Sequence, residues 1–277
     1  MTSLRRRLDV ELVRRGLAPS RERAREEIAA GRVTVGGAPA LTPARLVQPD
    51  EPVLVAEAGA RFVSRGGEKL AAALETFAID PAARDALDAG ASTGGFTDCL
   101  LQRGAAHVTA VDVGRGQLHE RLRRQPRVTV VERTNVRHLT LATLDRPGRP
   151  FGLVVADLSF ISLRLVASAL VGVSGQGADI VVLVKPQFEA GRREADRGRG
   201  VISDPEVWRR ALEDIGAAFA DAGAAMMGIM VSPLLGARGN VEFLAHLVPG
   251  PLRAPSGVDL DAVVDAAGGL RRAGRGS

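Results

Sequence analysis

Two lysines, Lys69 and Lys185, stand out in a chain whose other cationic side chains, histidines apart, are all arginine. The 277-residue sequence holds 37 Lys and Arg residues in total, so arginine takes the place of lysine almost everywhere. An arginine is effectively never deprotonated, whereas a lysine is a compact amine that neighbouring groups can tune for acid–base work. These two positions are therefore where a cationic side chain could do chemistry that a guanidinium cannot.

One acid is expected at the same rim of the sheet as Lys185. Lys185 follows the apolar run Ile180–Val184, and Asp157 follows a similar run, so each should end a buried strand. In open α/β sheets ligands bind outside the carboxyl ends of strands, and both side chains are thus expected at one rim. Glu242 is predicted in the last strand, while Lys69 lies just ahead of the first strand.

The elements that must position these residues alternate between strand and helix after residue 63. Such alternation predicts a doubly wound α/β domain. The expected strands are 84–89, 107–112, 128–131, 152–157, 179–184, 225–231 and 240–246. The expected helices are 66–78, 95–103, 117–123, 162–171 and 205–220.

A glycine-rich turn follows the first strand. Its candidate ligand-binding residues are Asp88, Gly90, Ser92, Thr93, Gly94, Gly95 and Phe96. Glycines allow close approach of the backbone, and the N–H groups of the helix that follows face the ligand. Asp112 ends the second strand, where an acid suits a ribose diol. This geometry fits a dinucleotide or an adenosyl ligand.

Two details favour S-adenosylmethionine over a nicotinamide cofactor. The spacing Gly90-x-x-x-Gly94-Gly95 is not the G-x-G-x-x-G of dinucleotide sites. The Asp88-x-Gly90 start resembles the first motif of class I methyltransferases, in which the acid faces the methionine end of the cofactor. Asn135 follows the third strand, where adenine-contacting residues often lie in that fold.

The first 57 residues predict a small basic α+β module. Residues 5–25 hold eight arginines against three acids, and the whole chain has a net charge of +5 and a pI of about 10.6. Leu8 and Leu12 share one helix face and Gly16 is placed to end that helix; Ser20 can cap a second helix. Alternating valines after Gly31 predict strands. A polyanionic partner is expected.

This module resembles the αL RNA-binding module, which is named for a ribosomal protein. The resemblance rests on the runs Arg7–Asp9, Leu12–Leu17, Ser20–Arg21 and Gly31–Gly37. It implies that the two-helix face grips RNA phosphates, which supplies affinity but reads no sequence. The candidate RNA-binding residues are Arg6, Arg7, Arg14, Arg15, Arg21 and Arg25, with Arg65 beyond the module.

The order Lys69, Asp157, Lys185, Glu242 resembles the tetrad of FtsJ-type RNA ribose 2′-O-methyltransferases. With the module in front, residues 5–248 resemble the TlyA family of rRNA 2′-O-methyltransferases, historically labelled hemolysins. The resemblance implies that Lys185 contacts the 2′-hydroxyl, Asp157 orients Lys185, and Glu242 with Lys69 fixes the ribose. It leaves open whether Lys185 removes the proton or only positions the oxygen. The chain departs from the family pattern at Phe62, where relatives carry tryptophan in the connector.

The resulting prediction is a cytoplasmic enzyme that methylates rRNA in ribosomal subunits with S-adenosylmethionine. The expected parts are an RNA-binding domain (1–57), a connector (58–63), a methyltransferase domain (64–248) and a largely flexible tail (249–277) with a short helix near 260–267.

A single cysteine excludes an internal disulfide, the four histidines lack metal-ligand spacing, and no apolar run reaches the roughly 20 residues of a membrane span. The basic loop 191–200 is expected beside the site, as an RNA clamp or as a plain solvated loop. A non-catalytic RNA-binding assembly factor, a pore-forming hemolysin and a nicotinamide oxidoreductase are the alternatives, and oligomeric state is not readable.

Overall fold

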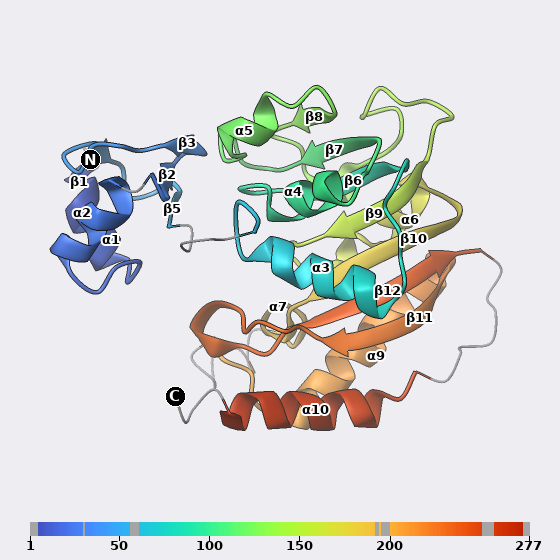
Figure 1. The fold of residues 1–277 in the computed structure, drawn as a ribbon. Coiled ribbons are helices and arrows are strands. Elements are labelled where there is room, and N and C mark those ends of the chain that lie inside the picture. The colour runs from blue at the N-terminus through green and yellow to red at the C-terminus, as the bar shows by residue number, and fades with distance from the viewer. Residues whose placement is uncertain are drawn as a thin grey trace.

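The computed structural model describes residues 5–29, 31–55, 61–191, 194, 200–250 and 258–273. Within these ranges a small N-terminal domain lies beside a larger α/β domain (Figure 1). In the part of the chain so described, no helix is both long and apolar enough to cross a membrane.

The N-terminal domain packs two helices against short antiparallel strands, as the sequence predicts. Its elements are β1 (Arg6–Arg7), α1 (Leu8–Arg14), α2 (Arg21–Ala29), β2 (Val33–Val35), β3 (Ala38–Pro39), β4 (Leu46–Val47) and β5 (Val53–Val55). β2 pairs with β3 and β5, and β1 pairs with β4. Leu8 and Leu12 are fully buried, and the Ser20 hydroxyl accepts a hydrogen bond from the Arg23 amide at 3.2 Å.

The α/β domain contains one seven-stranded sheet. Its strands are β6 (Asp85–Ala89), β7 (His107–Val111), β8 (Val128–Val131), β9 (Phe151–Ala156), β10 (Ser174–Val184), β11 (Ala224–Val231) and β12 (Phe243–Pro249). Its helices are α3 (Gly66–Thr76), α4 (Gly95–Gln102), α5 (Glu120–Arg123), α6 (Ala167–Val173), α7 (Pro186–Glu189) and α9 (Pro205–Asp221), with 3₁₀ turns η1 (Val136–His138), η2 (Leu163–Leu165) and η3 (Ala237–Gly239).

The strand order is β11-β12-β10-β9-β6-β7-β8. β6 to β10 run parallel, and β12 is antiparallel to both of its neighbours. Helices α3 and α4 cover one face through Leu70 and Leu100, while α6 and α9 cover the other through Leu170 and Leu212 (Figure 1). This is the Rossmann-like architecture that the alternating pattern predicts, and it brings the carboxyl ends of the parallel strands to one edge.

Two predicted boundaries near the site are wrong. Glu242 precedes the last strand instead of lying in it, because Asn240 is hydrogen-bonded to the 200–202 segment and the Gly236 amide. Of the helix expected over 117–123, only α5 forms. The residues ahead of it form an irregular segment, and the His119 ring caps the helix by accepting from the Arg121 amide at 3.1 Å.

The segment expected to be a largely flexible tail contains a helix longer than predicted. α10 spans Leu260–Ala273 and packs against α9 and β11. The Val264 and Ala267 side chains on its apolar face are buried, as expected for an amphipathic helix that packs on a domain. Residues 251–257 and 274–277 lie outside the described residues.

A buried acid, Asp9, organises several arginines of the N-terminal domain. The Asp9 carboxylate is fully buried and contacts the guanidinium groups of Arg7, Arg21 and Arg25. Burial alone would raise the pKa of Asp9, but hydrogen bonds from Arg7 and Arg21 outweigh it and lower that pKa well below the ordinary value. The domain therefore depends on an ionised carboxylate.

Substituting Asp9→Asn should destabilise this domain by about 1–2 kcal/mol at neutral pH, since the guanidinium groups would lose their anionic partner. The figure is modest because those arginines are about half exposed. A lowered folded-state pKa means that the stabilisation is fully present above an ordinary carboxyl pKa of about 4 and is lost progressively as the pH falls from there through the lowered pKa of Asp9.

Hydrogen exchange of α1 and α2 amides at pH 7 and pH 3 measures this effect. Exchange at pH 7 should be roughly 5–30-fold faster in the variant, and this ratio should be smaller at pH 3, which lies below the ordinary carboxyl pKa but above the lowered pKa of Asp9. Glu26→Gln is the control, because Glu26 and its partner Arg23 are both more than half exposed. Equal exchange in the two variants would contradict this role for Asp9.

Candidate active site

The carboxyl ends of β6 and β9 meet where the strand order of the sheet reverses. Gly90 follows β6 with a φ of +84°, a left-handed conformation that favours glycine. A Cβ atom at this position would lie 2.6 Å from the carbonyl oxygen of Asp157, which follows β9. Glycine thus permits the two strand ends to approach, at the place where ligands bind in open α/β sheets.

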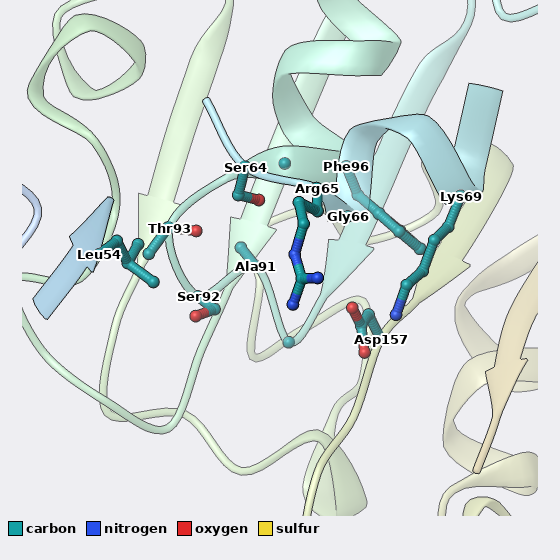
Figure 2. A pocket seen from close by; sticks show the side chains of 12 residues that line it. Leu54, Ser64, Arg65, Gly66, Lys69, Ala91, Ser92, Thr93, Phe96 and Asp157 are labelled. Carbon is teal, nitrogen blue, oxygen red and sulfur yellow. The ribbon is translucent and has the colours of Figure 1, made fainter. Parts of the chain in front are cut away.

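A pocket opens at this point (Figure 2). Its walls are the start of α3, the glycine turn, the end of β9 and, from the N-terminal domain, β5. The lining residues are Leu54, Ser64, Arg65, Gly66, Lys69, Gly90, Ala91, Ser92, Thr93, Gly95, Phe96 and Asp157. Figure 2 shows Lys69 and Asp157 at one end of the pocket and Leu54 near Thr93 at the other.

Lys185 lies directly after β10 and forms an ion pair with Asp157. The Lys185 Nζ is 2.6 Å from Asp157 Oδ1 and donates a hydrogen bond to the Ser159 hydroxyl at 2.9 Å. The Lys185 side chain is 10% exposed. Asp157 Oδ1 is close enough for the ion pair but accepts no well-aligned hydrogen bond, so it retains hydrogen-bonding capacity.

Lys69 forms a second ion pair, with Glu242. The Lys69 Nζ lies 2.5 Å from Glu242 Oε2, and the glutamate side chain is only 3% exposed. On its other side Glu242 packs against Gly236, where a Cβ atom would lie 2.0 Å from Oε1. The carboxylate is therefore held in one place from both sides.

Strand register brings the two ion pairs together. Val184 of β10 is paired with Phe243 of β12 in an antiparallel register. Lys185 and Glu242, the next residue outward on each strand, thus leave the sheet at neighbouring positions. Since Asp157 and Lys69 both line the pocket, the four predicted tetrad residues gather at one rim as two cations and two anions.

Asp88 lies beneath the pocket and does not line it. Its carboxylate is fully buried and accepts a 2.6 Å hydrogen bond from the Thr97 hydroxyl at Oδ2, whereas Oδ1 has no partner. Burial, together with the nearby charges of Asp157 and Asp112, raises the pKa of Asp88 to about 7 despite the bond from Thr97. In this structure the side chain ties the end of β6 to the first turn of α4.

Asp112 and Asn135 lie at the far side of the turn. The two carboxylate oxygens of Asp112 accept hydrogen bonds from the amides of Ser92 (2.8 Å) and Gly114 (2.7 Å). Each oxygen has a further lone pair that a ribose hydroxyl could use. The Asn135 side chain is exposed and caps η1 by accepting from the Arg137 amide, so the structure uses it as a capping residue. Neither residue lines the pocket.

An exposed aromatic residue beside the tetrad was missed at the sequence level. Phe160 is 90% exposed and has a φ of +64°, which is uncommon for a residue with a bulky side chain. Its ring centroid lies 5.2 Å from that of Phe188, and the Lys185 amine lies 6.0 Å from the Phe188 ring centroid. Its place directly after Ser159 and three residues past Asp157 was the available signal.

The candidate RNA-binding arginines divide by environment. Arg7, Arg14, Arg21 and Arg25 are about half exposed and contact the buried carboxylates of the N-terminal helices, and Arg6 is exposed. Arg15 is only 19% exposed, because its guanidinium donates to the carbonyls of residues 48, 49 and 51 and to Glu11. The structure thus uses Arg15 to hold the domain together.

Arg65 lies apart from these arginines, and its side chain extends into the pocket (Figure 2).

The predicted connector ends at Phe62 and Val63. Phe62 is buried against Gly67, and the Val63 amide donates to Asp98 at 2.8 Å. Residues 58–60 of the connector, and 192–193 and 195–199 of the predicted loop, lie outside the described residues.

Family comparisons agree with this arrangement. Residues 62–248 match the FtsJ-like methyltransferase family and residues 6–53 match the S4 domain. The chain is 50% identical over 264 residues to the 16S/23S rRNA (cytidine-2′-O)-methyltransferase TlyA of Mycobacterium tuberculosis, covering 95% of this chain and 97% of that protein.

Two further relatives carry a hemolysin name. Hemolysin A of Brachyspira hyodysenteriae is 36% identical over 242 residues, covering 87% of this chain and 99% of that protein. A solved structure of a hemolysin-named protein from Streptococcus thermophilus superposes with a TM-score of 0.77 at 34% identity, covering 100% of both chains. Because it has an S4 domain ahead of an FtsJ-like methyltransferase domain and matches TlyA over nearly its whole length, the chain belongs to the TlyA family of rRNA 2′-O-methyltransferases.

Proposed function

We propose that this protein transfers a methyl group from S-adenosylmethionine to the ribose 2′-hydroxyl of a cytidine in ribosomal RNA, acting on ribosomal subunits in the cytoplasm. The observation that carries the proposal is the convergence of the Lys185–Asp157 and Lys69–Glu242 pairs at the pocket rim. The substrate class follows the relative from Mycobacterium tuberculosis, whose name specifies cytidine 2′-O-methylation of rRNA.

The pocket has features that suit S-adenosylmethionine. Gly90 and Gly94 have left-handed backbones at which a Cβ atom would meet neighbouring atoms at 2.6 Å and 2.3 Å, so the turn has room only for glycine. Asp157 lines the pocket, and its Oδ1, although ion-paired with Lys185, accepts no well-aligned hydrogen bond and so can accept one from a donor-rich ligand. When bound, the cofactor would supply an electrophilic methyl group on a sulfonium cation. The turn 90–96 would hold it, with Asp112 facing its ribose.

The chain itself must orient the 2′-hydroxyl and receive its proton as the new oxygen–carbon bond forms. An ammonium has three N–H donors, and at Lys185 one faces Asp157 and one faces Ser159. The third is free to donate to the 2′-oxygen and aim its lone pair. The proton passes to the Lys185–Asp157 pair, in which the Asp157 carboxylate has lone pairs that can receive it.

The second ion pair holds the other side of the target ribose. Lys69 lines the pocket while Glu242, pinned between Lys69 and Gly236, sets the position of the amine. Fixing both sides of a hydroxyl nucleophile turns an encounter of two molecules into a reaction within one complex. This can lower the activation free energy by several kcal/mol.

The rest of the RNA meets two further surfaces. The half-exposed arginines of the S4 domain suit phosphates, which bind without regard to sequence. Phe160 offers its ring to solvent beside the tetrad, where a base withdrawn from its stack could lie against it.

Mapping 2′-O-methyl groups in rRNA tests the proposal directly. Subunits from cells that lack the protein are incubated with the purified chain and S-adenosylmethionine carrying a tritiated methyl group. Label at a cytidine 2′-oxygen is expected. Binding to subunits without label would favour the non-catalytic assembly factor, and selective binding of a nicotinamide nucleotide would favour an oxidoreductase.

The variant Lys185→Arg should abolish methyl transfer, with a fall of about 100-fold or more, because a planar guanidinium can neither replace a compact ammonium between Asp157 and Ser159 nor exchange a proton. Initial rates on subunits measure the loss, while the melting temperature and cofactor binding should be nearly unchanged. Arg84→Lys, just ahead of β6 and ion-paired with Asp179 of β10, is the matched control and should stay active. Wild-type turnover by Lys185→Arg would remove Lys185 from the mechanism.

Gly236→Ala should slow transfer by roughly 10- to 100-fold, because the new methyl group would displace Glu242 and with it Lys69. Rates and cofactor binding are measured together. Gly172→Ala, where the added carbon meets nothing within 4 Å, should behave as the wild type. If the two variants turned over equally fast, the placement of Glu242 would be irrelevant to catalysis.

Phe160→Ala should lower kcat/KM for the RNA by roughly 5- to 100-fold, since stacking contributes about 1–3 kcal/mol per base. Steady-state kinetics with varied RNA and saturating cofactor measure the effect. The comparison is Leu165→Ala, another exposed apolar side chain, at 53% exposure in the nearby turn η2. Equal losses in both variants would indicate that general apolar contact, not stacking at residue 160, is responsible.

A further inference from the structure

A hairpin turn of the S4 domain docks on the methyltransferase domain. The Gly37 carbonyl accepts a hydrogen bond from the Glu120 amide at 3.0 Å. Gly37 has a φ of +77°, and a Cβ atom there would lie 2.4 Å from the carbonyl oxygen of Leu118 and 2.6 Å from that of Gln117. Only glycine allows this backbone-to-backbone approach, so the contact is specific to this turn.

The segment that receives the turn also covers the glycine turn of the pocket. The His119 amide donates to the Thr93 carbonyl at 3.1 Å. A Cβ atom at Gly94 would lie 2.3 Å from Leu122 Cδ1 and 2.8 Å from Leu118 Cδ1. Residues 117–122 are thus held between the S4 hairpin on one side and the ligand-binding turn on the other.

The S4 domain also reaches the pocket itself. Leu54 of β5 is one of the lining residues, and Figure 2 shows it beside Thr93 and Ser92. Leu54 is paired with Thr34 of β2, the strand that leads into the hairpin turn at Gly36 and Gly37. One small sheet therefore carries both the docking turn and a piece of the pocket wall, and the two must move together.

We propose that the S4 domain completes the cofactor pocket, so that its docking through Gly37 sets cofactor affinity and couples it to RNA binding. A shift of this domain would withdraw Leu54 and release residues 117–122 from the glycine turn. RNA bound to the S4 arginines changes the position or rigidity of the domain. This change alters the contact of Leu54 with the pocket and therefore the affinity for the cofactor. By linkage, the bound cofactor changes RNA affinity by the same factor. This inference rests on the proposed use of S-adenosylmethionine.

The test compares Gly37→Ala with Gly31→Ala in the full chain. Gly31 also has a left-handed backbone, with a φ of +69°, but an added Cβ atom there meets nothing within 4 Å. The two substitutions therefore share the backbone strain, and only Gly37→Ala disrupts the docking. Leu54→Ala is a third variant, which removes the pocket contact without touching the turn.

Calorimetric titration of S-adenosylmethionine is the readout, with and without unmodified ribosomal subunits. Gly37→Ala should weaken cofactor binding by about 5-fold or more and abolish the change in cofactor Kd that subunits cause in the wild type. Leu54→Ala should weaken binding in the same direction, and Gly31→Ala should match the wild type.

Equal cofactor affinity in Gly37→Ala, Leu54→Ala and Gly31→Ala would overturn the inference, as would a wild-type cofactor Kd that subunits leave unchanged. Circular dichroism and the melting temperature check that each variant is folded, and Leu54→Ala alone decides the matter if Gly37→Ala does not fold. A wild-type chain that binds no S-adenosylmethionine would instead refute the proposed function, so the two failures are distinguishable.

Discussion

Burial of four charged groups at one edge of the sheet is the constraint on which the rest of this structure depends. The side chains of Lys69, Lys185 and Glu242 are each no more than 12% exposed. An isolated charge so far from water would cost several kcal/mol, whereas two cations and two anions in contact largely offset that cost. These four residues lie on α3 and at the ends of β9, β10 and β12. The strand order and the antiparallel direction of β12 are therefore needed to bring the four charges together.

Much of this arrangement could be predicted because its signals are local. A run of β-branched residues ending in Lys185 or Asp157 identifies a buried strand and its carboxyl end without knowledge of distant segments. The glycine turn after β6 and the two helices of the S4 domain were predictable for the same reason. The pairing of the four charged residues came from family resemblance, since spacing alone says nothing about which acid meets which lysine.

What could not be predicted depends on contacts between distant segments. Leu54 reads in the sequence as an ordinary strand residue, and only the docking of one domain on the other brings it to the pocket. Gly37 reads as part of a hairpin turn, yet its lack of a side chain is required by Leu118, about eighty residues away. The sequence predicts Glu242 in the last strand, whereas hydrogen bonds between Asn240 and a separate segment delay the start of that strand.

The scarcity of lysine gains a physical meaning from these contacts. Elsewhere in the described chain arginine forms nearly all the ion pairs, and the three around Asp9 show that a flat guanidinium with several donors is well suited to share a carboxylate at a half-exposed surface. At the pocket rim a smaller cationic group is needed. The Lys185 amine fits between Asp157 and Ser159 at 2.6 Å and 2.9 Å and keeps a donor for a third oxygen. A guanidinium would spread its donors over a plane and fill the space that the ribose needs. On the proposed mechanism the composition of the chain separates two tasks, since arginines would supply charge for holding RNA and the two lysines would supply small amines that aim a hydroxyl.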